Sequence, residues 1–169
     1  MHVYILDLVM TNASQRFQAA QLLPAILLVW FGLVIGVSFI ATPAKFIVPE
    51  LDLITAIKVG RATFHVFLYV EGSIAATIVL ILITQNLSRI KRLYLGTLIT
   101  LFLLQQTVIS PLVKINSESL FNGNADYSSY PHIVFIGSEV IKALLLVGYT
   151  TITSRVETAY EKITKASHV

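Results

Sequence analysis

The sequence predicts an all-α integral membrane protein, a bundle of four transmembrane helices preceded by a short interfacial helix. Hydrophobic residues make up 56% of the 169 residues and charged residues only 12%, with a mean hydropathy of +0.79. Soluble domains are about a quarter charged. The apolar residues also gather in four runs, each long enough to cross a hydrocarbon core of about 30 Å.

The four runs cover residues 19–41, 61–84, 93–113 and 132–151, and we expect one membrane domain over residues 1–169. Pro24 lies in the first turn of the first run and Pro131 lies at the start of the fourth, where helices tolerate proline. Residues 1–17 mix apolar and polar positions and predict a helix lying in the membrane interface. We expect no internal repeat.

Lysine and arginine predict the orientation. Arg89, Lys91 and Arg92 cluster between the second and third runs, on the same side as both termini. Basic residues favour the cytoplasmic side, so we expect a multi-pass protein with both termini in the cytoplasm. Residues 42–60 and 110–130 then form outer loops, the second rich in turn-forming residues.

Several classes of function are disfavoured. The chain has no cysteine, which excludes disulfides, thiolate metal sites and cysteine nucleophiles. It has no P-loop, dinucleotide fingerprint or nucleophile elbow, so nothing in the sequence indicates an enzyme. The net charge of +3 resides mostly in short loops, so we expect no nucleic-acid partner.

Polar side chains inside membrane spans are costly and therefore need a reason. We take eight of them as candidates for a ligand site or a polar network: Arg61, His65, Glu71, Gln105, Gln106, His132, Glu139 and Lys142. Counted along the helices, they gather in the outer half of the bundle, and His132 and Glu139 share one helix face. The formal charges of Arg61, Glu71, Glu139 and Lys142 sum to zero, which favours pairing across helices.

Two interpretations of these residues stay open. They form a polar pocket that binds a small ligand or relays protons, or they pair across helices and fix the bundle. His65 and His132 are also able to ligate haem or a metal, although no tight ligand motif surrounds them. The cofactor, if there is one, is not specified by the sequence.

Small residues at four-residue spacing predict close helix contacts. They are Gly32 and Gly36 in the first run, and Gly72 and Ala76 in the second. They serve either packing within the bundle or a contact with another subunit. Trp30 fits a belt of aromatic residues in contact with lipid.

The segment from Ser38 to Phe46, followed by Ala56 and then Gly60 to Phe64, resembles the small four-span family typified by transmembrane protein 205. Pro111 closing the third run and His132 opening the fourth look similar as well. The resemblance implies a four-helix membrane fold and says little about mechanism.

The sequence leaves three functions to weigh. The first is a non-catalytic accessory or structural subunit of a larger membrane complex, with the lipid bilayer and other membrane subunits, or further copies of the chain, as its partners. The second is a small ligand-binding, transport or proton-relay protein that uses the polar layer. The third is a redox protein of the membrane that binds haem, a metal or a quinone.

Overall fold

The computed structural model describes residues 22–121 and 128–166 and places four helices long and apolar enough to span a membrane. They are Leu22–Ile47 (span 1), Leu53–Thr84 (span 2), Arg89–Phe121 (span 3) and Tyr130–Tyr149 (span 4). The prediction of an all-α bundle of four transmembrane helices is thus confirmed. The predicted interfacial helix at 1–17 lies outside the described residues.

Spans 1 and 3 each combine several helical elements. Span 1 is α-helical over 22–34 and continues as η1 (Ile35–Ala41), α2 (Thr42–Ala44) and η2 (Lys45–Ile47). Span 3 consists of α4 (Arg89–Leu104), η3 (Gln105–Ile109) and α5 (Ser110–Phe121). Span 2 is the single helix α3 (Leu53–Thr84), and span 4 is the first part of α6 (Tyr130–Ala166).

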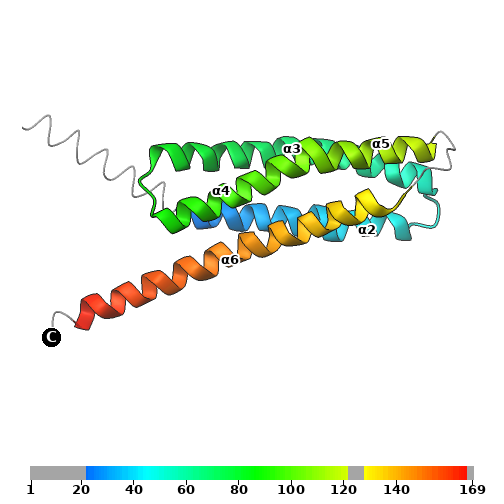
Figure 1. The fold of residues 1–169 in the computed structure, drawn as a ribbon. Helices are drawn as coiled ribbons and strands as arrows, with labels where there is room; N and C mark the ends of the chain where they lie inside the picture. The colour runs from blue at the N-terminus through cyan, green and yellow to red at the C-terminus, as the bar shows by residue number, and fades with distance from the viewer. Residues whose placement is uncertain (1–21, 122–127, 167–169) are drawn as a thin grey trace, which may run out of the picture.

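The four spans run side by side, each antiparallel to the next along the chain (Figure 1). Spans 2 and 3 pack against each other, as do spans 3 and 4, and η1 of span 1 contacts both α3 and α6. The spans therefore form a square in which spans 2 and 4 lie diagonally opposite. Figure 1 also shows α6 extending well past the other helices at the end where α3 joins α4.

The helices are longer than the sequence predicts. α3 begins at Leu53, not near residue 61, because Asp52 caps it: the Thr55 amide and hydroxyl donate to the Asp52 carboxylate at 3.0 and 2.7 Å. The predicted loop over 42–60 shrinks to residues 48–52. The predicted loop over 110–130 is likewise wrong in extent, because α5 continues to Phe121.

Prolines inside spans 1 and 3 are accommodated by π-helical turns. η1 and η3 are π-helices, and each ends two residues before a proline, Pro43 or Pro111. A proline lacks an amide donor and its ring clashes with the carbonyl four residues earlier. A π turn shifts the backbone hydrogen-bond pattern just before the proline. Span 3 therefore continues past Pro111, which we expected to end it.

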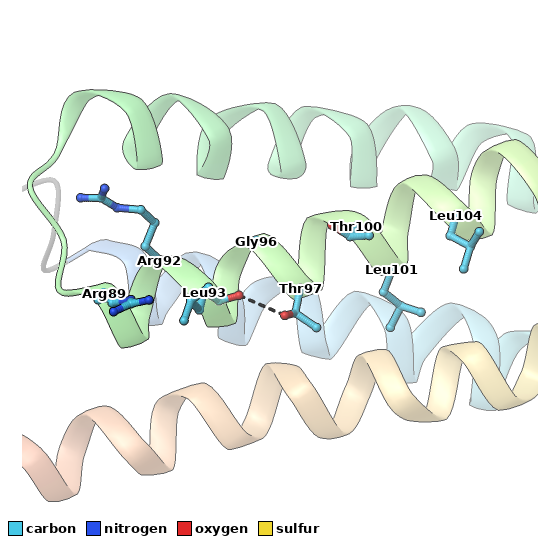
Figure 2. Close-up of a pocket in the computed structure, with 8 residues that line it drawn as sticks. All are labelled: Arg89, Arg92, Leu93, Gly96, Thr97, Thr100, Leu101 and Leu104. Atoms are coloured by element: carbon cyan, nitrogen blue, oxygen red, sulfur yellow. Dashed lines mark hydrogen bonds between the residues drawn. The ribbon is translucent and has the colours of Figure 1, made fainter.

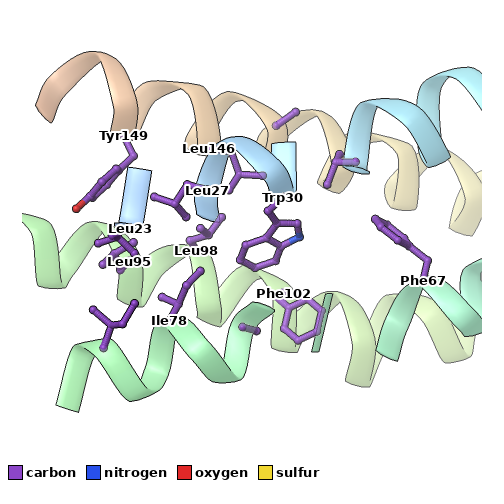
Figure 3. Packing of buried hydrophobic residues seen from close by; sticks show 14 residues of the cluster. Leu23, Leu27, Trp30, Phe67, Ile78, Leu95, Leu98, Phe102, Leu146 and Tyr149 are labelled. Atoms are coloured by element: carbon purple, nitrogen blue, oxygen red, sulfur yellow. The ribbon is translucent and has the colours of Figure 1, made fainter. Parts of the chain in front are cut away.

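A hydrophobic core occupies the centre of the bundle, with Trp30 at its middle (Figure 3). The Trp30 and Phe102 rings meet edge to face with centroids 5.9 Å apart. Trp30 is fully buried, so the expectation that it belongs to a lipid-facing belt is wrong. Farther along, the Tyr94 hydroxyl donates to the Leu145 carbonyl at 2.8 Å and joins α4 to α6.

Candidate functional site: a buried charge cluster beneath a cavity

All four spans contribute a polar side chain to one buried cluster on the axis of the bundle. We call this group the charge cluster; its members are Trp30, Ser38, Glu71, Gln105, Glu139 and Lys142. Five of them are buried, and only Ser38 is partly exposed. Four of the eight predicted polar residues, Glu71, Gln105, Glu139 and Lys142, thus come together.

Lys142 is the centre of the charge cluster. Its Nζ donates to Glu71 Oε1 and to Glu139 Oε1, both at 2.7 Å. Lys142 is 0% exposed and each glutamate 1%. Glu139 lies one turn away on the same helix, whereas Glu71 lies across the bundle on α3, so the lysine joins the two opposite spans.

Spans 1 and 3 provide donors to the same carboxylates. Trp30 Nε1 donates to Glu71 Oε1 at 2.7 Å, and the Ser38 hydroxyl donates to Glu139 Oε2 at 2.7 Å. The Gln105 amide nitrogen also donates to Glu139 Oε1. Ser38 lies in η1 and Gln105 in η3, so each π turn presents one donor to Glu139.

The charge cluster has one more acid than base. Ionised Glu71 and Glu139 face a single ammonium, that of Lys142, and within the described residues no other cation lies within 4 Å of either carboxylate. The fourth charge that the sequence groups with them, Arg61, instead pairs with Glu118 at 3.0 Å near the surface. The predicted neutral quartet is therefore wrong, because the charge cluster combines two carboxyl groups with a single amine.

One polar atom in the charge cluster lacks a partner. Gln105 is 0% exposed, and its Oε1 accepts no hydrogen bond among the described residues. A buried carbonyl oxygen left unpaired costs roughly 1–3 kcal/mol. It is an acceptor available to a proton donor or a cation beside Glu139.

A cavity of about 580 Å³ lies between the charge cluster and the end of the bundle that carries residues 48–52. All four spans line it, and Glu71 forms part of its wall. The other four predicted polar residues, Arg61, His65, Gln106 and His132, line this cavity and do not join the charge cluster. Phe64 and Phe135 meet edge to face in its wall, with ring centroids 5.2 Å apart.

Basic side chains dominate the charges of the cavity. Lys45, Arg61 and Lys114 line it, and Glu71 is the acidic residue of the lining. Arg61 is neutralised by Glu118, but Lys45 makes no ion pair among the described residues. The Lys45 ammonium rests over Gly60, where a Cβ would collide with it. Gly60 thus makes room for an unpaired cation in the cavity.

His65 and His132 do not form a metal site with acids of the described residues. His65 stacks edge to face on Tyr69 with ring centroids 5.3 Å apart. Across the described residues, no group of three His, Cys, Asp or Glu side chains is placed to hold a metal ion. A redox function with a metal held by three such side chains therefore gains no support from their placement.

A larger hollow of about 930 Å³ lies elsewhere, along the outer face of α4 (Figure 2). Among the residues that the structure describes, its lining comes from that one helix, from Arg89 to Leu104. Figure 2 shows their side chains arranged along a single helix face, with Arg89 and Arg92 at its start.

Within the part of the chain that the structure describes, the predicted small residues do not mark close helix crossings. A Cβ added at Gly32, Gly36 or Gly72 meets nothing within 4 Å among the described residues, and Ala76 is exposed. The close approaches occur instead at Gly60, under Lys45, and at Gly148, where a Cβ would lie 2.5 Å from the Tyr94 hydroxyl. Within the described residues, the predicted motif therefore shows no close helix contact.

Trp30 and Ser38 are the members of the charge cluster that the sequence does not reveal. Tryptophan and serine are common in membrane helices, and both are uncharged, so neither needs an ion-pair partner. The one feature of the sequence that could have linked them is their spacing of eight residues, which is close to two helical turns.

No family model, no curated protein and no solved structure matches this chain.

Proposed function

We propose that this integral membrane protein binds a small amphipathic anion in the cavity and transports it. The single observation that carries the proposal is the unpaired Lys45 inside a cavity walled by aromatic side chains. The volume of about 580 Å³ suits a small organic molecule. An anionic headgroup would pair with Lys45, and its apolar body would lie against Phe64, Phe67 and Phe135.

The binding test uses octanoate, octyl phosphate and the uncharged octanol on protein in lipid nanodiscs. Trp30 is the only tryptophan of the chain and donates to Glu71 in the cavity wall, so its emission reports occupancy. We expect a saturable change with at least one anion and none with octanol. Lys45→Gln should weaken anion binding about tenfold, the effect of losing about 1.4 kcal/mol.

Lys91→Gln is the matched control, because Lys91 lies in the first turn of α4 at the opposite end of the bundle. It should bind like the wild-type protein. Equal responses to octanol and both anions, or unchanged affinity in Lys45→Gln, would contradict the proposal. For transport, the anion that binds should accumulate in proteoliposomes only when Lys45 is intact.

A second candidate is a subunit of a larger membrane complex. The open space over Gly32 and Gly36 favours it, because glycines at this spacing let a further helix approach closely. Native mass spectrometry of protein extracted gently from its own membrane tests it. Polypeptides bound at a fixed ratio would support a subunit role, whereas a lone chain with a bound small molecule would support the first proposal.

Membership of the family typified by transmembrane protein 205 stays a prediction.

A further inference from the structure

The two halves of the chain repeat each other at a constant separation, contrary to our expectation of no repeat. Pro43 and Pro111 are 68 positions apart (43 to 111), and the π turns before them end at Ala41 and Ile109, the same distance apart. Thr42 and Ser110, which precede the prolines, keep that separation too.

The helices that follow carry the same motif at the same separation. Val66-Phe67-x3-Glu71-x3-Ala75-x3-Val79 in α3 becomes Val134-Phe135-x3-Glu139-x3-Ala143-x3-Val147 in α6. The two glutamates of the charge cluster are therefore equivalent positions of the repeat.

Burial follows the repeat as well. Seven pairs of residues at this separation are buried in both copies: Leu27 and Leu95, Trp30 and Leu98, Val34 and Phe102, Glu71 and Glu139, Ala75 and Ala143, Ile78 and Leu146, and Ile81 and Tyr149. The chain thus consists of two parallel copies of a two-helix unit, spans 1–2 and spans 3–4, arranged around the bundle axis. In membrane proteins built from such repeats, ion sites commonly lie between the copies near the middle of the membrane.

The symmetry is broken at one position that matters for charge. Lys142 of the second copy corresponds to Ile74 of the first. A fully symmetric site would hold two acids and two lysines, or two acids alone. The actual site holds two equivalent carboxylates and one lysine, beside the unpartnered Gln105 oxygen.

We propose that the charge cluster binds one exchangeable proton, shared between the equivalent carboxylates Glu71 and Glu139. Among the described residues, the titratable groups that face it are these two on α3 and α6, and Lys142 on α6. Spans 1 and 3 contribute Trp30, Ser38 and Gln105 there. Lys45, Arg61, His65, Lys114 and His132 line the cavity that leads to it.

The proton enters from water in the cavity and forms an O–H bond with a carboxylate oxygen, with no change in oxidation state. The cluster then becomes neutral, which removes the cost of an uncompensated charge in a dry interior. When Glu139 holds the proton, its new O–H needs an acceptor. The Gln105 carbonyl provides one once its amide turns over.

The test measures proton binding by two signals in the reconstituted protein. Trp30 emission follows the charge of Glu71, and infrared difference spectra follow the carboxylic acid C=O band. We expect both to titrate together as a single proton in the wild-type protein. Glu71→Gln and Glu139→Gln should each abolish the titration, because one acid and one lysine already balance.

Ile74→Lys provides a variant that keeps both acids. It restores the missing lysine at the equivalent position and should also abolish proton uptake. Glu50→Gln, at an exposed connection outside the cluster, is the control and should titrate like the wild type. Thermal unfolding of each variant confirms that it is folded before its titration is interpreted.

Three results would overturn the proposal. The first is a wild-type protein without a carboxylic acid band that varies with pH. The second is a band that persists in both single glutamine variants. The third is a Trp30 response to sodium at constant pH and none to protons. The last would identify a sodium site. This proposal does not depend on the anion: loss of octanoate or octyl phosphate binding leaves the proton titration unchanged.

Discussion

At the scale of single residues, Lys142 is the group that compensates the two buried carboxylates at the centre of the bundle. A lysine buried without contact to water is stabilised only by its partners, and removing one member of a buried ion pair leaves the others uncompensated. Lys142 holds two carboxylates at 2.7 Å each, so its loss leaves two buried negative charges. The lysine is a structural requirement as well as part of the proposed proton site.

Lys142→Met should therefore destabilise the protein by about 3–5 kcal/mol, seen as a lower midpoint in thermal unfolding. Adding Glu71→Gln and Glu139→Gln to that variant removes both charges and should recover most of the loss. Lys58→Met, at an exposed position of α3, controls for the substitution itself. Equal midpoints for Lys142→Met and Lys58→Met would contradict the central role of the lysine.

At the scale of elements, a tight contact between α4 and α6 depends on Gly148. The Tyr94 hydroxyl donates to Leu145 and lies 2.5 Å from the place of a Cβ at Gly148. Gly148→Ala should displace Tyr94, break that bond and cost about 1–3 kcal/mol in unfolding free energy. Gly137→Ala on the same helix has open space and should be neutral or slightly stabilising. If both variants unfold alike, Tyr94 is not held as described.

The start of α3 should depend on pH. Hydrogen bonds from the Thr55 hydroxyl and amide to the carboxylate lower the pKa of Asp52 below its ordinary value. A depressed pKa in the folded state stabilises that state above the unfolded pKa, and the benefit disappears as pH falls through the folded pKa. The protection factors of the first-turn amides of α3, which compare each exchange rate with that of an unstructured amide at the same pH, should therefore fall in acid. Asp52→Asn should remove this pH dependence while it keeps a capping side chain.

Some elements were predictable and others were not, for physical reasons. Hydropathy identifies the four spans because burial in lipid requires long apolar runs. It misses the first turns of α3 and the part of α5 beyond residue 113, since Asp52 and the polar residues of α5 carry no apolar signal. The cost of burying charge explains why polar side chains of different spans come together, here Glu71, Gln105, Glu139 and Lys142. It does not predict which charged side chain pairs with which. Arg61 is close enough to the surface to pair with Glu118, and a sequence alone does not order such competing contacts.

At the scale of the whole molecule, orientation stays a prediction from the basic cluster at Arg89, Lys91 and Arg92. The chain has no cysteine, so an introduced one is the only thiol. Glu50→Cys should react with an impermeant maleimide from outside intact cells. Ser88→Cys should react only after the membrane is opened. The reverse pattern would place both termini outside.

α6 extends from the charge cluster well past the ends of the other helices. The apolar span Tyr130–Tyr149 forms the first part of this helix, which runs on to Ala166, about 36 Å beyond Lys142. A straight helix acts as a lever: a tilt of about 5° at Lys142 would move Ala166 by about 3 Å. A change as small as one proton beside Lys142 would thereby become a displacement that another molecule outside the membrane could sense.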